Sequence, residues 1–509
     1  MKDQPSKLLQ HLLPTFANLV WMVAFFIVLI SGPRLMNADG DLGRHLTIGR
    51  YILEHSEIPL RDLFSHTMAG QPLTPHEWLA QVIFALADKL MGLNGVILVC
   101  AVIIATTFRF VFVQARLASR TLGVALLVVM LAMLASAMHW LSRPHIFTFL
   151  LLAVWMTVLL QLRKGKVKQW WLLPALMLIW ANLHGAFIAG FATWIIYGVG
   201  LFWDSLHHNI PEDDELHPRF WRYYLLGGGA AFLVSLINPS GLGLWKTSLG
   251  YIGNDYLVNH TVEYMSPNFH NANFWRFLIF IALLLVAIGL SKKRIESGLL
   301  FTSAAWLVMG LYSGRNIPLF AIVAAPLLAQ GLDELMSGVI SRVKFLGRLN
   351  DMDVRIQKVD AALKGYFWPI LSVVIAVICF SAGVKFDAGK TGNVFYPQLF
   401  PVDAVNWLQE NPQKGDMFNS FTWGGYLLYR LWPEKQVFID GQTDFYGEAL
   451  SREYAKVMNA AEGWQSILED YQVEWAILPS KDGIVQALGS DLGWESVYSD
   501  ATAVILRRK

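Results

Sequence analysis

The chain has 509 residues, 55% of them hydrophobic and 15% charged, with a formal net charge of +2. This composition is too apolar for a soluble protein of this length. The two cysteines, Cys100 and Cys379, both lie in apolar segments, which argues against a disulfide framework or a thiolate zinc site. We expect no nucleic-acid partner.

Apolar blocks recur along the chain, and a membrane helix needs roughly 20 such residues. Helices are expected because a spanning segment must satisfy its own backbone hydrogen bonds. The first block follows an N-terminus without an obvious cleavage site, so we expect a retained helix. Spanning helices, about eleven in all, are predicted near 14–32, 95–113, 121–138, 146–162, 170–182, 186–203, 222–237, 273–290, 297–312, 316–334 and 367–383.

Two aspartates, Asp39 and Asp41, follow the first helix and are separated only by Gly40. Asp41 opens an amphipathic helical segment, with His45 one turn along on the same face. A carboxylate here could remove a proton from an acceptor hydroxyl or amine. The pair could also hold a divalent cation, and Asp41 could cap the helix. The capping and catalytic roles are compatible.

A second cluster lies later in the same loop, where Asp62 is followed by His76, Glu77 and Trp78. These residues are candidates for substrate binding. The alternative, which we rank ahead of direct chemistry, is loop packing, with Glu77 at a helix start and Trp78 as an interfacial anchor.

The segment His76–Met91 is apolar but shorter than a full span, and the positive-inside rule decides its role. If it does not cross, the basic runs at 163–168 and 291–294 and the loop 335–366 all face the cytoplasm. We therefore predict that it lies on the outer leaflet, within a first outer loop at about 33–94. The N-terminus is then cytoplasmic and the C-terminus outside.

Cationic and imidazole groups recur in the later outward turns, namely Arg143 and His145 in LSRPH, His184 in NLHG and Arg315 in SGRNIP. Arginine suits phosphate because its planar fork binds two oxygens. Alone, an arginine could snorkel to a headgroup, and a histidine could bond a neighbouring helix. Together on one face, these groups favour an anion site.

Residues 385–509 are predicted to form a soluble α/β domain after the membrane domain of residues 1–384. Its expected strands are QVFID, VEWAILP and TAVILRR, and its expected helices are VDAVNWLQEN and the stretch Ala449–Met458. The turn at Asp440 could bind a ligand or could have only a structural role.

The overall layout resembles the GT-C superfamily of membrane glycosyltransferases, which includes protein O-mannosyltransferases, aminoarabinose transferases of lipid A and oligosaccharyltransferases. The first loop is similar to that of a bacterial branch with a D-x-x-x-H, an acidic-Phe-Ser step and an H-E-W-L. WGGYL and IDG-x-x-D-x-Y are similar to its C-terminal domain. One departure is Gly43-Arg44, where relatives often have an aromatic pair. The matching first-loop segments are Asp41 with His45, Asp62-Leu63-Phe64-Ser65 and His76-Glu77-Trp78-Leu79.

The resemblance implies a helical polytopic enzyme of a bacterial cytoplasmic membrane with an extracytoplasmic C-terminal domain. Its partners would be a polyprenyl-phosphate sugar donor, a glycan, lipid or protein acceptor, and membrane lipid. Displacement would be inverting, with Asp41 or Asp39 as base and the basic groups on the donor phosphate. A transporter or flippase of a lipid-linked glycan, a polysaccharide polymerase or ligase, and a non-catalytic scaffold remain alternatives.

Overall fold

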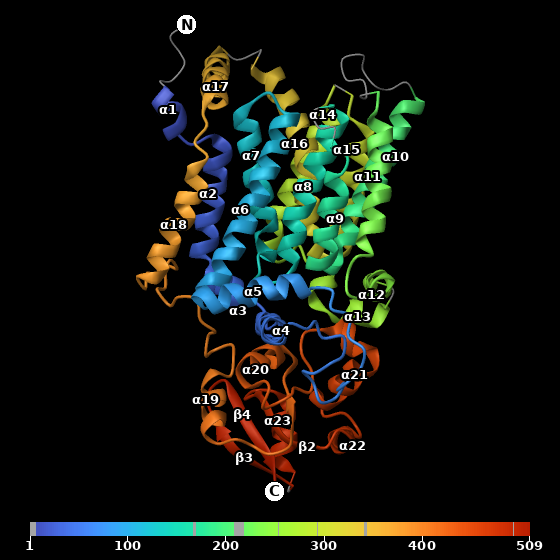
Figure 1. Cartoon of the computed structure of the whole chain (residues 1–509), viewed down its shortest axis with the longest axis vertical. Helices are drawn as coiled ribbons and strands as arrows, with labels where there is room; N and C mark the ends of the chain where they lie inside the picture. The colour runs from blue at the N-terminus through green and yellow to red at the C-terminus, as the bar shows by residue number, and fades with distance from the viewer. Residues whose placement is uncertain are drawn as a thin grey trace.

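The computed structural model describes residues 7–165, 169–207, 218–252, 254–292, 294–340, 344–491 and 493–509. A bundle of helices stands on a smaller C-terminal region that contains the only sheet of the described residues (Figure 1). We call the end of the bundle that meets this region the domain end. The opposite end, which carries α1 (Lys7–Leu12) and α17 (Lys344–Ala362), is the basic end.

Each predicted span coincides with a helix. Among the described residues, seven stretches are long and apolar enough to cross a membrane, or eight if Asp351–Ala362 and Phe367–Ser381, which are bent by 76° relative to each other, count as one span. The total of eleven spans stays a prediction, because α9 and α15 are shorter. The bundle helices are α2 (Phe16–Ile30), α6 (Leu93–Ala118), α7 (Leu122–Ser136), α8 (His145–Arg163), α9 (Leu172–Leu183), α10 (Ile188–Leu206), α11 (Phe220–Ser235), α14 (Trp275–Leu290), α15 (Ser297–Tyr312), α16 (Ile317–Ile340) and α18 (Phe367–Ser381).

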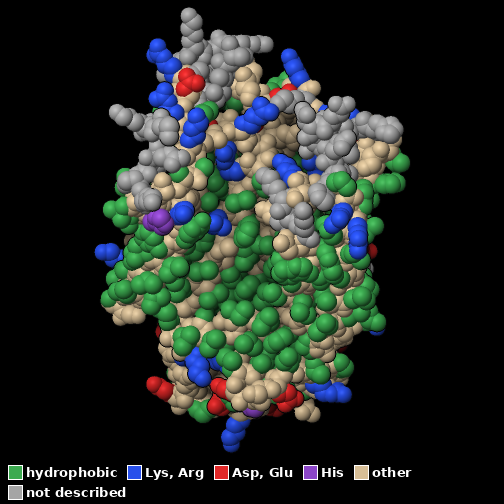
Figure 2. Space-filling model, turned by 45° about the horizontal axis from the view of Figure 1, so that its top comes forward, with side chains coloured by type: hydrophobic (Ala, Val, Ile, Leu, Met, Phe, Trp, Pro, Cys, Tyr) green, Lys and Arg blue, Asp and Glu red, His purple; other side chains and the backbone are tan. Residues whose placement is uncertain are grey.

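The two ends of the bundle differ in charge. Figure 2 shows a belt of hydrophobic side chains around the middle of the molecule, with Lys and Arg gathered toward the basic end. The basic loops therefore lie together, opposite the C-terminal region, as the charge pattern predicts. Lys2 and residues 166–168, 293 and 341–343 belong to the same predicted cytoplasmic side but lie outside the described residues.

The first loop forms short helices beneath the bundle rather than a further span. They are α3 (Gly32–Asn37), α4 (Leu42–His55) and α5 (Trp78–Met91). α5 lies across the domain end, as predicted for a helix that does not cross (Figure 1). It packs closely on α4: a Cβ at Gly49 would overlap the backbone oxygen of Gln81.

Short breaks between consecutive helices place the polar motifs at the domain end. LSRPH, NLHG and SGRN lie beside the 3-10 turns η1 (Ala137–His139), η2 (Gly185–Phe187) and η6 (Gly314–Asn316). Backbone groups freed at such breaks need polar partners, so polar side chains collect there. A fourth segment at the domain end holds α12 (Leu242–Ile252), α13 (Asp255–His260), η4 (Val262–Tyr264) and η5 (Ala272–Phe274).

The C-terminal region is α/β, as expected, with strand order β1-β2-β4-β3. β1 and β2 are parallel, and the other two pairs are antiparallel. Its elements are α19 (Val402–Glu410), β1 (Asp416–Asn419), η7 (Phe421–Trp423), α20 (Gly424–Leu431), α21 (Thr443–Met458), α22 (Trp464–Asp470), β2 (Val473–Pro479), α23 (Gly483–Ser490), β3 (Trp494–Ser499) and β4 (Ala503–Arg508).

The strands predicted at VEWAILP and TAVILRR are confirmed, but the one predicted at QVFID is wrong. Val437 makes only an isolated bridge, to Ser65 of the first loop. Its N–H donates to the Phe64 carbonyl at 3.0 Å, and its own carbonyl accepts from His66 at 3.1 Å. The first loop therefore takes the backbone hydrogen bonds that a sheet neighbour would have supplied.

Candidate active site

Asp41 begins α4, but its side chain does not cap the helix. The Asp41 carboxylate instead forms an ion pair with Arg143. The backbone N–H of Asp41 donates to Asp39 Oδ1 at 2.9 Å. The predicted helix start is confirmed, whereas capping by the side chain is wrong, because the guanidinium outcompetes the helix amides for this carboxylate. The hydrogen bond from the Asp41 N–H also holds the Asp39 side chain in place.

Arg143 stands at the centre of three carboxylates. It comes from the turn before α8 and lies 3.5 Å from Asp39 Oδ2 and 2.6 Å from Glu263 Oε1, besides its pair with Asp41. Burial opposes its charge, but Asp41 and Glu263 outweigh burial and raise the pKa of Arg143 above its ordinary value. The arginine therefore stays charged and holds the acidic residues in place.

The three carboxyl groups have different environments. Burial raises the pKa of Asp39 to about 7, against the attraction of Arg143 and with added repulsion from Asp41. Against the effect of burial, Arg143 and then Arg315 lower the pKa of Glu263 to about 2. Because like charges at close range disfavour one another, a proton on Asp39 relieves the cluster. Asp39 is therefore the member that exchanges a proton near neutrality.

Glu263 was missed by the sequence reasoning. It lies in η4, in a loop at the domain end without a recognisable motif, and its only signal in the sequence was that this loop was predicted on the same side as the aspartates. The next residue, Tyr264, accepts a hydrogen bond from Arg315, whose guanidinium lies 4.8 Å from the Tyr264 ring centroid. Glu263 contacts Arg143 and Tyr264 contacts Arg315, so these two consecutive residues connect the two arginines. A common cavity for the two arginines stays a prediction.

Glu77 is surrounded by histidines. Its carboxylate lies 3.4 Å from His184 Nε2, 3.7 Å from His45 Nδ1 and 3.9 Å from His76 Nε2. Burial, followed by Arg44, lowers the pKa of His45 well below its usual range, so this imidazole is neutral. The structure brings these four predicted residues together, beside the acidic cluster.

The remaining predicted residues make local contacts. Asp62 accepts hydrogen bonds from the N–H of Phe64 and Ser65, both at 3.1 Å, and from the Ser65 hydroxyl at 2.6 Å. These bonds fit the loop-packing alternative. His145 Nε2 lies 2.8 Å from the His139 carbonyl. Trp78 donates to Asn182 at 2.9 Å, so it is tied to the bundle rather than serving only as an interfacial anchor.

The C-terminal region closes over the aspartates. Arg44 pairs with the buried Asp440 at 3.3 Å and donates to Gln442. Gly441 lies so close that a Cβ there would overlap Asp41 Oδ1. Burial raises the pKa of Asp440 to about 6, with Arg44 opposing the rise. The turn at Asp440 therefore contacts the candidate site directly.

Arg143 occupies the carboxylates considered for a cation. It contacts both Asp39 and Asp41, and within the described ranges no group of three or more His, Cys, Asp or Glu residues is arranged to hold a metal ion. A divalent cation on the pair of Asp39 and Asp41 stays a prediction.

No protein-family model and no curated protein matches the sequence. Among solved structures, the chain is similar to the oligosaccharyltransferase of Archaeoglobus fulgidus tethered with an acceptor peptide (TM-score 0.59, 13% identity, 91% of this chain and 69% of that chain). It is similar to ArnT from Cupriavidus metallidurans bound to undecaprenyl phosphate (TM-score 0.53, 13% identity, 96% and 97%). Arabinofuranosyltransferase AftD from Mycobacteria gives a TM-score of 0.51 at 12% identity over 97% and 42%. The chain thus has the GT-C fold.

Proposed function

We propose that this chain is a glycosyltransferase that moves a sugar from a polyprenyl-phosphate donor to an acceptor at the domain end, with inversion. The observation that carries the proposal is the pair of carboxylates on Arg143 where the bundle meets the C-terminal region. The fold supports it, because ArnT was solved with undecaprenyl phosphate and the archaeal enzyme with an acceptor peptide.

In the proposed reaction an acceptor hydroxyl or amine attacks the anomeric carbon of the sugar. The bond from that carbon to the phosphate oxygen breaks, and its electron pair leaves with the lipid phosphate. The acceptor's proton passes to a carboxylate within about 3 Å, directly or through one water. Asp41 is our choice of base, because the start of α4 and the contact with Gly441 fix its position.

Arg143 would serve both partners of the reaction. A donor phosphate can accept two parallel hydrogen bonds from a guanidinium and would compete with the carboxylates for it. As Arg143 binds the phosphate, its ion pair with Asp41 would open and leave that carboxylate free to contact the acceptor. Arg315, connected through Tyr264, would add positive charge as the leaving phosphate becomes more negative. Donor binding would then itself activate the base.

Substitution of Asp41 tests the proposal. We expect Asp41→Asn to reduce transfer by about 10²- to 10⁴-fold, the usual contribution of a positioned base, while the protein still inserts and folds. The measurement is release of polyprenyl phosphate in proteoliposomes supplied with a lipid-linked sugar that the wild type accepts. Asp403→Asn, at an exposed position on α19, is the control.

Full turnover by Asp41→Asn would contradict the assignment of the base. Movement of a fluorescent polyprenyl lipid across the bilayer, without any sugar transfer, would point to a flippase instead.

A further inference from the structure

A polar cavity lies at the basic end, remote from the carboxylates. It has a volume of about 250 Å³ and opens between the ends of α6, α8, α10, α15 and α16. Pro326, which interrupts the hydrogen bonding of α16, lines it. Pockets that enclose a drug-sized ligand measure roughly 300–1,000 Å³. This cavity therefore suits a headgroup rather than a whole lipid.

The carboxylates that line the cavity are already engaged. Asp204 accepts from the Ser297 N–H at 2.9 Å and from the Ser297 hydroxyl at 2.6 Å. Asp333 accepts from the Thr121 N–H at 2.9 Å, and Glu334 accepts from the Lys292 N–H at 2.6 Å. Glu296 forms an ion pair with Arg163 at 3.1 Å. These acids therefore cap neighbouring segments or pair with the buried arginine, and the cavity lining balances their four negative charges with four cations, Arg120, Arg163, Lys164 and Arg294.

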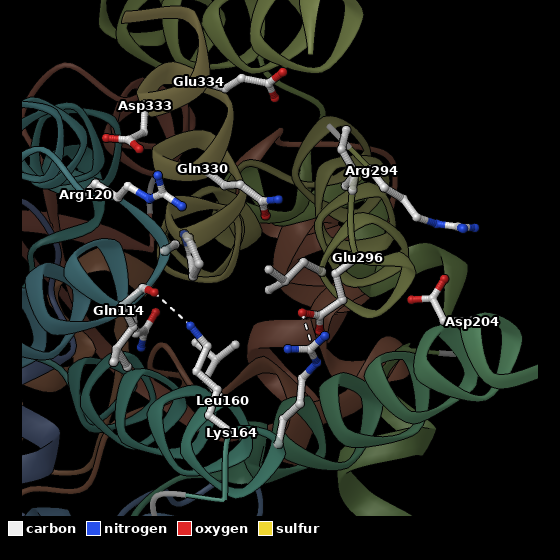
Figure 3. A pocket seen from close by; sticks show the side chains of 16 residues that line it. Gln114, Arg120, Leu160, Lys164, Asp204, Arg294, Glu296, Gln330, Asp333 and Glu334 are labelled. Carbon is white, nitrogen blue, oxygen red and sulfur yellow. Dashed lines mark hydrogen bonds and ion pairs between the residues drawn. The ribbon is translucent and has the colours of Figure 1, made fainter. Parts of the chain in front are cut away.

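Positive charge remains at the rim. Arg120 and Arg294 are exposed and form no ion pair with any described carboxylate. Lys164 donates to the Leu117 carbonyl at 2.8 Å and so brings its ammonium group to the same wall. In Figure 3, the neighbouring side chains of Arg120 and Gln330 both extend toward the middle of the cavity. An anion entering the opening would meet these donors first.

Deeper in the cavity lies an acceptor without a donor. Gln114 is fully buried, and its amide nitrogen donates to the Ala153 carbonyl at 2.6 Å and to the Thr157 hydroxyl at 3.1 Å. Its Oε1 has no hydrogen-bond partner in the described structure. Gln114 lies four residues before the end of α6, about 6 Å deeper at the helical rise. A buried acceptor is costly when unsatisfied, so a ligand that donates here is stabilised.

We propose that this cavity binds the phosphodiester headgroup of a membrane lipid. The phosphate would lie between Arg120 and Lys164, and a hydroxyl or ammonium group beyond it would donate to Gln114 Oε1. A membrane lipid supplies both groups, and the leaflet beside the apolar belt delivers it at this height of the bundle. The site is independent of the carboxylates at the domain end, so it holds whatever the catalytic reaction proves to be.

Lipid titration of the whole chain in detergent, followed by native mass spectrometry, tests the site. The probe is phosphatidylglycerol, which carries a phosphodiester and hydroxyl donors. We expect Arg120→Gln to weaken its binding about tenfold, because a charge-assisted contact is lost. Arg355→Gln removes the same charge from an exposed position on α17, outside the cavity, and should leave binding unchanged.

A second variant separates binding inside the cavity from attraction to its surface. Ala118→Trp keeps every charge but fills the opening, so it should abolish the bound lipid. Equal binding by wild type, Arg120→Gln and Ala118→Trp would overturn the proposal. Displacement of the lipid by excess inorganic phosphate would assign the site to free phosphate and overturn the lipid as its source. If Ala118→Trp fails to fold, the exposed Arg120 variant still decides.

Discussion

Asp39 and Asp41 are two positions apart, yet their surroundings give them different tasks. Asp41 opens α4 and pairs with Arg143, whereas the buried Asp39 Oδ2 has no hydrogen-bond partner among the described residues and lies 3.5 Å from Arg143. The pKa of Asp39 rises to about 7 because burial penalises its charge more than Arg143 favours it. We infer that Asp39 binds a proton near neutral pH, whereas the Asp41 carboxylate is the one paired with Arg143 and packed against Gly441.

The raised pKa of Asp39 predicts a pH-dependent stability difference. At pH values between 3.8, the ordinary pKa of aspartate, and about 7, the pKa of Asp39 in the folded state, folded Asp39 holds a proton that the unfolded chain has released. The free energy of unfolding of the wild type therefore falls as pH rises through this window. Asp39→Asn removes this pH-dependent loss of folding free energy. The thermal stability of the variant should therefore rise relative to that of the wild type as the pH increases from 4 to 8.

Thermal unfolding in one detergent at several pH values measures this effect. Asp403→Asn, at an exposed aspartate, provides the control and should follow the wild type. A difference in melting temperature between Asp39→Asn and the wild type that does not change with pH would contradict the prediction. It would show that Asp39 is ionised over the whole pH range, as an ordinary surface aspartate is.

At the scale of elements, α4 is held between the bundle and the C-terminal region. α5 packs on one side of it, and α20 packs on the other, where a Cβ at Gly43 would overlap the Gly425 carbonyl oxygen. Glycines permit this close approach of two backbones, which any side chain would prevent. The turn at Gly441 extends the same contact onto Asp41, so the C-terminal region sets the position of the proposed base.

We therefore expect Gly441→Ala to reduce transfer although Gly441 carries no functional group. The added methyl would displace the Asp41 carboxylate, and crowding of this kind costs about 1–3 kcal/mol. Gly489→Ala on α23 is the matched control, because a Cβ there meets no atom within 4 Å. The readouts are transfer rate and thermal stability. Wild-type transfer by Gly441→Ala would show that the C-terminal region does not position Asp41.

At the scale of the whole molecule, the two ends of the helix bundle differ in charge. The basic loops gather at one end, and the C-terminal region lies at the other (Figures 1 and 2). The Arg143 carboxylate cluster lies at the start of α4 and in η4, next to the C-terminal region. The core of the bundle also continues into the C-terminal region through Phe400, Tyr426 and Leu427. The two parts are therefore expected to move as one body.

The positive-inside rule predicts which end faces the cytoplasm. In a chain whose Cys100 and Cys379 are replaced by alanine, Lys358→Cys on α17 should resist an impermeant maleimide in intact cells. Ser490→Cys on α23 should be labelled under the same conditions. Both positions are exposed, so access alone distinguishes them. Labelling of position 358 from outside would reverse the orientation and would place the proposed site in the cytoplasm.

The sequence by itself determined the helix positions, the non-crossing α5 and the gathering of polar motifs at one end. These features depend on local hydrophobicity and on charge, which are properties of consecutive residues. Only the tertiary structure decided that Arg143 binds carboxylates, that Glu263 joins it and that Gly441 packs against Asp41. The QVFID segment failed as a strand for the same reason, because its partner is the distant first loop. Contacts between residues hundreds of positions apart depend on the packing of whole elements, which no local pattern records.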